Sequence, residues 1–230
     1  MGLRENVVPF FLCGFAEVIY SRADPAITQD TQLFSKPYRM WKLLAPIVQA
    51  LLITLAAGVT YFLTYKVNEL LDSWVLYTQG IALVFLPAGI KHIAILIAGK
   101  WGALGCLVAL FVLANDFWSG APTEQIAAYS VISTAATWIG IILSMRLLQI
   151  DQGLRSLKFM HLPLMDLITT SIHGFTTNAF FLLAGMKSEN FMGNALAMMF
   201  GDFVGSFIIL TLLWSGLLLT RTRARLQQEG

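Results

Sequence analysis

Residues 80–114 read GIALVFLPAGIKHIAILIAGKWGALGCLVALFVLA, and this stretch decides the fold class of the chain. It is almost continuously apolar, does not alternate with a period of two, and is interrupted by one proline and several glycines. Apolar runs of about 20 residues are typical of helices that cross the roughly 30 Å of hydrocarbon in a bilayer. The stretch therefore predicts membrane-spanning α-helices and disfavours a transmembrane β-barrel.

The composition of the whole chain indicates the same class. Of 230 residues, 57% are hydrophobic and 12% are charged, and the mean hydropathy is +0.71. An ordinary soluble domain carries roughly a quarter of charged residues. The longest segment outside the apolar runs is residues 1–42, so we expect no separate soluble catalytic domain. The net charge of +2 has no basic excess that would indicate a nucleic-acid partner.

Six apolar runs can be delimited, and they predict an all-α, polytopic integral membrane bundle of about six transmembrane helices. Each run is long enough to cross a bilayer except the third, which is short. The runs are residues 43–65, 74–98, 101–115, 125–148, 161–185 and 191–219. The domain organisation expected is an N-terminal cytoplasmic or interfacial segment, the membrane bundle and a basic tail, over residues 1–42, 43–219 and 220–230.

The distribution of basic residues predicts the orientation of these runs, because cytoplasmic loops are enriched in Lys and Arg. With six crossings, twelve of the fifteen basic residues fall on one side of the membrane and two, Lys66 and Lys187, on the other. The twelve are Arg4, Arg22, Lys36, Arg39, Lys42, Lys100, Arg146, Arg155, Lys158, Arg221, Arg223 and Arg225. Both termini are therefore predicted to be cytoplasmic, and the acidic connection 115–124 is predicted to lie outside.

The N-terminal segment contains an apolar stretch from Val7 to Tyr20, which is interrupted by Pro9 and carries Glu17. It has no small-residue cleavage site, so we expect it to be retained rather than removed as a signal peptide. Its 14 residues are too few to span the bilayer. The stretch therefore predicts an interfacial amphipathic helix or a plug against the bundle.

The fifth run carries a polar face inside the membrane. It reads HLPLMDLITTSIHGFTTNAF over residues 161–180. At about 100° per residue, Asp166 and His173 fall within roughly 20° of one face. The polar residues at helical spacing are Asp166, Thr169, Thr170, His173, Thr177 and Asn178. Three interpretations stay open: interhelical hydrogen bonding, a ligand or ion site, and an interface between protomers. Asp166 is near the cytoplasmic end and is also compatible with an interfacial position.

The second run contains FLPAGIKHIAILIAG, residues 85–99. Pro87 removes a backbone donor and Gly89 loosens the helix, which predicts a kink or a break of the kind that exposes backbone groups in transporters. With a break, the amides of a new helix N-terminus together with Lys91 and the adjacent His92 would form an anion-receptive corner. The alternative is a simple proline kink with Lys91 extending towards the cytoplasm.

The last run places Asp202 between Gly201 and Gly205. A GxxxG pair allows two helices to approach closely, although such pairs are common in membrane helices. A carboxylate buried at that contact needs a partner, and the candidates are Lys91, His92 and His173. We expect Asp202 to contact the segment 85–92.

The sequence does not favour an enzyme. It has no nucleophile with an evident base, no His and Glu zinc pattern and no phosphate-binding glycine loop. No metal spacing exists around Cys13 and Cys106, which we expect to be free thiols, and no cofactor is expected. Haem ligation by His92 together with either His161 or His173 is a remaining alternative.

Three motifs resemble the membrane-associated sensor domain of the first type. They are LPAGI at 86–90, GKWGALG at 99–105 and GDFVG at 201–205. The positions shared on this resemblance are Pro87, Gly89, Gly102, Gly105, Gly201, Asp202 and Gly205. The family usually feeds histidine-kinase or cyclic-di-GMP output domains and is described with about eight helices. This chain has six apolar runs and eleven residues after Leu219, so the resemblance implies signalling through a separate partner.

A looser resemblance links the chain to the substrate-binding component of energy-coupling-factor transporters. Six helices, cytoplasmic termini and a polar interior are shared, and AAGV at 56–59 could supply a small-residue docking surface. The expected function is a standalone ligand-sensing or accessory subunit of the bacterial inner membrane. The alternatives are a component of a solute-uptake transporter and a structural subunit. The expected partners are the bilayer, another membrane or cytoplasmic protein and a small-molecule ligand.

Overall fold

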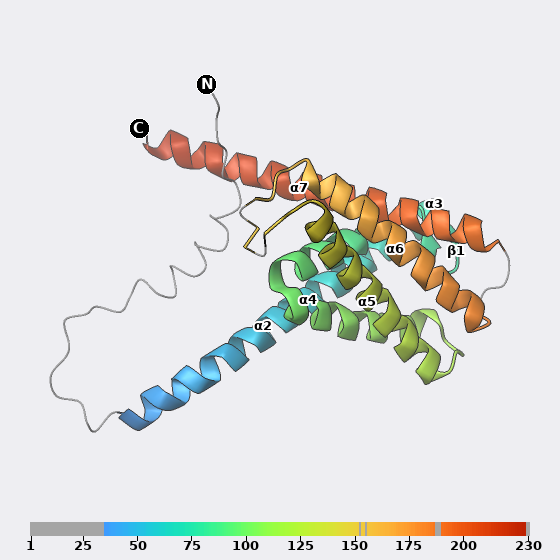
Figure 1. The fold of residues 1–230 in the computed structure, drawn as a ribbon, viewed down its shortest axis with the longest axis horizontal. Coiled ribbons are helices and arrows are strands. Elements are labelled where there is room, and N and C mark those ends of the chain that lie inside the picture. The colour runs from blue at the N-terminus through green and yellow to red at the C-terminus, as the bar shows by residue number, and fades with distance from the viewer. Residues whose placement is uncertain (1–34, 152, 155, 187–189, 229–230) are drawn as a thin grey trace.

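The computed structural model describes residues 35–151, 153–154, 156–186 and 190–228, which form helices and a small β-hairpin (Figure 1). The elements are α2 Ser35–Glu69, α3 Asp72–Val75, β1 Leu76–Thr78, β2 Ile81–Ala82, α4 Leu86–Phe117, α5 Thr123–Leu147, α6 His161–Leu183 and α7 Phe191–Gln228. The predicted all-helical fold is confirmed. The predicted interfacial helix or plug at residues 7–20 lies outside the described residues. Residues 220–228, predicted as a separate tail, continue α7.

Four of the described helices are long and apolar enough to cross a membrane. They cover Leu44–Glu69, Leu86–Phe117, Thr123–Leu147 and Phe191–Leu213. α6 has 23 residues but is not one of the four, because side chains such as Asp166, His173 and Asn178 lower its hydropathy. The chain is thus a membrane-type helical protein with four candidate spans in its described part, and the count of six crossings stays a prediction.

The second apolar run is interrupted near Pro87, but the interruption is not a proline kink. Within residues 74–85, the first two are the last residues of α3. The antiparallel β1–β2 hairpin follows and leads into α4. α4 begins at Leu86, so Pro87 stands in its first turn, where the missing N–H costs no helical hydrogen bond. Residues 74–98 are therefore not one continuous membrane-spanning helix as predicted, because only 13 residues, 86–98, are helical between the β-hairpin and the next break.

That next break is at Gly99, whose φ of 55° and ψ of −127° are not helical. In a continuous helix Ala94 and Gly102 would lie about 12 Å apart along the axis. Instead, a Cβ atom added to Gly102 would lie 2.1 Å from the carbonyl oxygen of Ala94. α4 is therefore a helical hairpin of segments 86–98 and 100–117 that reverses at Gly99. This reversal separates the predicted second and third runs.

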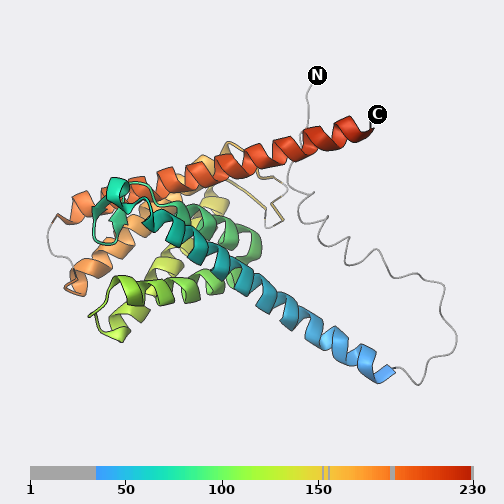
Figure 2. The same cartoon turned by 180° about the vertical axis from the view of Figure 1, so that it is seen from behind.

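The bundle has two ends, which we name by what lies there. The hairpin end contains the β1–β2 hairpin, the connection 117–123 and the end of α6, since Ile81, Trp118 and Phe181 share one apolar cluster. The Gly99 end contains the reversal of α4 and the connection 147–161, because Ile95 and Ile150 share a second cluster. Figure 1 shows the connections 117–123 and 147–161 at opposite ends of α5. Figure 2 shows α2 extending away from the other helices.

Glycines bring the central backbones into direct contact. Phe85 donates its amide to the carbonyl of Gly201 at 3.0 Å, and a Cβ atom added to Gly205 would lie 2.1 Å from the carbonyl oxygen of Phe85. α7 thus packs its GxxxG face against the chain that enters α4. On the other side of α4, Gly105 packs against the carbonyl oxygen of Thr54 and the backbone of Gly58 in α2. These contacts fix the start of α4 at the depth of Asp202.

Candidate functional site

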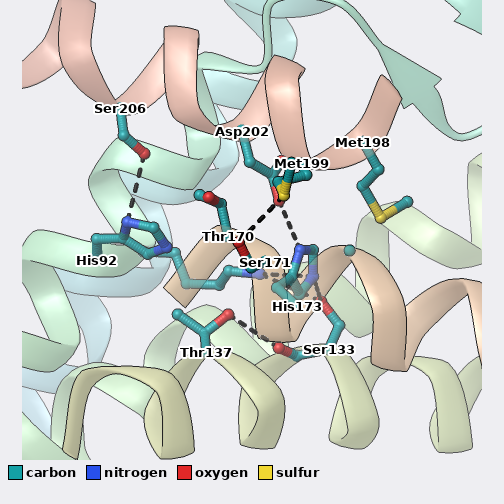
Figure 3. A network of polar contacts seen from close by, with 12 residues as sticks. His92, Ser133, Thr137, Thr170, Ser171, His173, Met198, Met199, Asp202 and Ser206 are labelled. Carbon is teal, nitrogen blue, oxygen red and sulfur yellow. Dashed lines mark hydrogen bonds and ion pairs between the residues drawn. The ribbon is translucent and has the colours of Figure 1, made fainter. Parts of the chain in front are cut away.

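A hydrogen-bonded network occupies the space between α4, α5, α6 and α7 (Figure 3). At its centre is His173 of α6. Its Nδ1 atom lies 2.5 Å from Oδ2 of Asp202 in α7, and its Nε2 atom lies 2.8 Å from the hydroxyl of Ser133 in α5. Both ring nitrogens therefore have partners on neighbouring helices. The expected partner for the Asp202 carboxylate is present, and it is the histidine of the polar helix.

Lys91 joins this network from α4. Its ammonium nitrogen lies 3.2 Å from Oγ of Ser133, to which it donates, and 3.3 Å from Nε2 of His173. The side chain is 2% exposed, so it does not extend towards the cytoplasm as the kink interpretation requires. The anion-receptive corner is not formed in the expected way either, since the amide of Leu86 donates to Oδ1 of Asn68 at 2.9 Å.

A second acid and imidazole pair lies next to the first. Nδ1 of His92 in α4 lies 2.5 Å from Oδ1 of Asp166 in α6, and Oγ of Ser206 in α7 lies 3.4 Å from the same nitrogen. Asp166 is 3% exposed, so its carboxylate faces the bundle interior. The contact of Asp202 with segment 85–92 is thus indirect, through His173 to Lys91. The two pairs share α6, and each reaches a different neighbouring helix.

The His173 pair lies near the middle of the bundle's length. Ser133 is ten residues from the start of α5, Asp202 is eleven from the start of α7, and His173 is ten from the end of α6. At 1.5 Å per residue each lies about 15 Å from the hairpin end, which is half of a hydrocarbon core of about 30 Å. Charged side chains at that depth are costly unless they pair with one another.

The buried positive and negative charges of the network can balance one another. Lys91 brings one positive charge, and Asp166 and Asp202 bring two negative charges, so a proton on either imidazole makes the group neutral. All three are at most 3% exposed. Breaking such a group by removing one partner leaves an uncompensated buried charge, which is strongly destabilising. The arrangement therefore holds α4, α6 and α7 together through their charges, and α5 joins through the hydroxyl of Ser133.

The remaining polar residues of α6 also face inwards. Asn178 donates to the carbonyl of Gly174 at 2.8 Å, and Thr170 donates to that of Leu167 at 3.3 Å. Thr169 and Thr177 are buried, and their hydroxyls have no hydrogen-bond partner among the described residues. The predicted polar stripe thus faces the bundle interior along its whole length. Unpaired hydroxyls in such a stripe are places where water or a ligand atom can bind.

A cavity of about 50 Å³ reaches the network from the hairpin end. We call it the hairpin-end cavity. Among its lining residues Glu69 and Asp72 are partly exposed, and we call this side its mouth. His173 and Asp202 are buried, and we call them its floor. Its walls are largely aromatic and apolar: Tyr65, Phe85, Leu110, Ala114, Phe117, Trp118, Tyr129 and Met198. A water molecule needs roughly 10–15 Å³ of such space, so the cavity is large enough for a few waters.

The mouth of the hairpin-end cavity is acidic. Burial and the neighbouring Glu69 raise the pKa of Asp72 above its ordinary value, while a hydrogen bond with Asn68 acts in the opposite direction. Lys66 pairs with Glu69 at 2.9 Å, which compensates one of the two carboxylates. The mouth therefore favours cationic or hydrogen-bonding solutes over anions.

A second, smaller cavity of about 30 Å³ touches the other pair. We call it the Gly99-end cavity, because Leu162 in the first turn of α6 is one of its walls. His92, Asp166 and Thr169 are its polar residues. The apolar walls are Ile93, Leu96, Ile141, Leu162, Met165 and Leu210. Each acid and imidazole pair thus lines a different cavity.

Sequence reasoning missed Ser133 and Ser206. A hydroxyl in an apolar helix is usually bonded within its own helix, as the hydroxyls of Ser130 and Thr137 are here. A signal did exist in α5, where hydroxyls recur three and four residues apart on the buried face. These residues are Ser130, Ser133, Thr134, Thr137 and Ser144.

The order hydroxyl, imidazole and carboxylate in Ser133, His173 and Asp202 is also that of the catalytic triad of serine hydrolases. Ser133 is 1% exposed and lines neither the hairpin-end cavity nor the Gly99-end cavity. A substrate in either cavity would therefore not reach its oxygen. Among the described residues there is also no group of three or more His, Cys, Asp or Glu side chains arranged to hold a metal ion.

Comparison of the chain with models of protein families, with curated proteins and with solved structures finds no match in any of the three. The geometry of the two cavities and of the network between them is therefore the basis for the functional argument.

Proposed function

We propose that the chain is a ligand-sensing or accessory subunit of the bacterial inner membrane that acts through a partner protein. The observation that supports this function best is the hairpin-end cavity. It connects residues at the mouth, such as Glu69, with the buried His173 and Asp202 on its floor. A small solute in this cavity would touch the two residues that hold α6 to α7.

Ligand binding at this floor has a direct route to a change in helix packing. The imidazole of His173 contacts Asp202 of α7, Ser133 of α5 and Lys91 of α4. A ligand that hydrogen-bonds to His173 or Asp202 competes with those contacts. It then shifts the bundle between two arrangements, provided that it has different affinities for them. A partner that contacts the helix ends would detect that shift.

The proposal includes six crossings with both termini cytoplasmic. Segment 86–98 covers only about 20 Å, so its pass would be completed by the non-helical residues 76–85 that precede it. Segment 100–117 would form the next pass, and α6 would cross because its polar face is turned inwards. The Gly99 end would then face the cytoplasm, since Lys100, Arg146 and Lys158 belong to its connections. The hairpin end, with the mouth of its cavity, would face the outside.

The three motifs that resemble the sensor family support sensing as the first choice. One feature disfavours the transporter component. Ala57 and Gly58, from the small-residue surface considered for partner docking, pack against Gly105 of α4. That surface is therefore partly occupied within the chain, whereas Ala56 and Val59 are exposed. A structural subunit remains the alternative if no solute binds.

The experiment is purification of the tagged protein from native membranes in mild detergent, with mass spectrometry of the co-purifying small molecules and proteins. We expect a small molecule with the wild type, its loss from His173→Gln, and its retention by His161→Gln. A kinase or cyclase as the co-purifying protein would support sensing, and a nucleotide-binding ATPase would support uptake. A large complex without any small molecule would contradict ligand sensing and favour a structural role.

A further inference from the structure

Two cavities approach the network from opposite ends of the bundle, and each ends on one acid and imidazole pair. The hairpin-end cavity reaches His173 and Asp202, and the Gly99-end cavity reaches His92 and Asp166. Neither cavity is lined by both pairs. A solute as large as a metabolite would find no continuous opening between the cavities.

The groups between the two cavities are of the kind that exchange protons. Nδ1 of His173 is 2.5 Å from the Asp202 carboxylate, and Nε2 of the same ring is 2.8 Å from the Ser133 hydroxyl. The Lys91 nitrogen lies within 3.3 Å of the Ser133 oxygen and of Nε2 of His173. His92 follows Lys91 directly in the chain, and its Nδ1 atom is 2.5 Å from Asp166. An imidazole can accept a proton at one nitrogen and release one from the other.

The step between the two pairs is short. On α7, Asp202 and Ser206 are one turn apart, about 6 Å along the axis. On α6, Thr170 lies one turn from Asp166 and three residues from His173, and its side chain is completely buried. In Figure 3 Thr170 lies between His92 and His173. Lys91 has a flexible four-carbon stem, so a rotation of its side chain carries a proton over part of this distance.

We propose that this network transfers protons across the membrane between the hairpin-end cavity and the Gly99-end cavity. The transfer does not depend on the solute considered above. Other titratable side chains that interact with Lys91 or Asp202 come from α2, α4 and α5, and they are Tyr61, Cys106 and Tyr129. The mouth of the hairpin-end cavity adds Glu69 and Asp72.

Each step moves one proton between two neighbouring groups, and the step from Lys91 to His92 requires a rotation of the lysine side chain. The ammonium of Lys91 first gives a proton to Nε2 of His92 and becomes a neutral amine. Asp202 takes a proton from water in the hairpin-end cavity and passes it to Nδ1 of His173, whose Nε2 proton then moves to this amine and restores the ammonium. Nδ1 of His92 then gives a proton to Asp166, which releases it to water in the Gly99-end cavity. Only N–H and O–H bonds are formed and broken.

A proton can cross the region between the two cavities, where a metal ion or an organic solute finds no opening. The cavities, of about 50 Å³ and 30 Å³, have room for waters that deliver and accept protons. The described residues hold no metal cluster of three ligands. Buried ionisable residues in membrane helices commonly serve as proton relays.

The test is proton flux into liposomes that contain the purified protein and an enclosed pH-sensitive dye. A potassium gradient with valinomycin makes the interior negative and drives protons inwards. We expect faster acidification than in protein-free liposomes. We also expect Asp202→Asn and Asp166→Asn each to reduce the rate to that of protein-free liposomes. Ser171→Ala is the matched control, because its hydroxyl bonds to Leu167 and Met199 outside the network.

Equal acidification in wild-type and protein-free liposomes would overturn the proposal, as would wild-type flux in both aspartate variants. Size-exclusion chromatography and circular dichroism establish that each variant is folded before its flux is compared. If one aspartate variant fails to fold, the wild-type measurement and the other variant still test the proposal of proton transfer. Solute binding to the wild type without proton flux would leave the sensing function standing and would reject proton transfer alone.

Discussion

His173 and Asp202 face each other across the contact of α6 and α7, with Nδ1 of the imidazole 2.5 Å from Oδ2 of the carboxylate. Both side chains are about 95% buried. Because the opposite ring nitrogen contacts Ser133, the ring is held from two sides. With Lys91 of α4 also 3.3 Å from that nitrogen, this one imidazole connects four helices at the floor of the hairpin-end cavity.

Removing the charge of Asp202 should destabilise the protein more than removing a neighbouring hydroxyl. Asp202→Asn leaves the buried Lys91 and His173 without a compensating carboxylate, and we expect a loss of about 2–3 kcal/mol. Ser206→Ala removes only a 3.4 Å contact with His92, for which we expect about 1 kcal/mol or less. Thermal unfolding in detergent measures both. Equal shifts in the two variants would mean that the Asp202 carboxylate is solvated.

The GxxxG face of α7 should not tolerate a methyl group. In Gly205→Ala the new Cβ would lie 2.1 Å from the carbonyl oxygen of Phe85, so α7 or the start of α4 must move. We expect a destabilisation of about 1–3 kcal/mol, as for other overpacked contacts. In Gly193→Ala, the control on the same helix, the nearest atoms belong to the flexible side chain of Asn190. An unchanged melting temperature in Gly205→Ala would contradict this packing.

The predicted orientation can be tested with single cysteines in a variant that lacks Cys13 and Cys106. Ser119 is exposed at the hairpin end, and Gly153 is exposed at the Gly99 end. Ser119 is preferable to Gly120, whose φ of 107° disfavours a side chain. We expect an impermeant maleimide to label Ser119→Cys from outside intact cells and to leave Gly153→Cys unlabelled until the membrane is opened. The reverse pattern would invert the topology.

The Ser133, His173 and Asp202 arrangement should not act as a hydrolase. Because Ser133 lines neither of the two cavities, we expect a fluorophosphonate probe to label the wild type no more than it labels Ser133→Ala. Ser130→Ala is the matched control, since this residue is one turn away and equally buried. Labelling that is retained in Ser130→Ala and lost in Ser133→Ala would identify an accessible nucleophile and would contradict the non-enzymatic interpretation.

Composition and apolar runs were sufficient to predict a helical membrane protein, because hydrocarbon demands long apolar helices whatever their tertiary contacts. The β1–β2 hairpin could not be predicted in the same way. Its turn residues, Thr78, Gln79 and Gly80, were included in a longer apolar run, and Gly80 packs beside Phe117 and Trp118, which are distant in the sequence. The reversal at Gly99 was easier to find, since Lys100 marks a connection between two apolar runs.

The residues of the candidate site could likewise be predicted only in part from the sequence. Asp166, His173 and Asp202 could be recognised because an ionisable group in an apolar run needs a partner. The assignment of partners was beyond the sequence, since Asp202 had three candidates and the choice depends on the rotation of α6 against α7. Ser133 was missed because its role arises only from contacts with Lys91 and His173, which are 42 and 40 residues away.

The central claim is that solutes reach the His173 and Asp202 pair from the hairpin end, and a cysteine in the wall of the hairpin-end cavity tests it most directly. Ala114 is 3% exposed and lines this cavity, whereas Ala109 on the same helix is 7% exposed and lines neither cavity. In the variant without Cys13 and Cys106, a charged, impermeant methanethiosulfonate should react from outside with Ala114→Cys much faster than with Ala109→Cys. Equal, slow reaction of both cysteines would contradict access from the hairpin end.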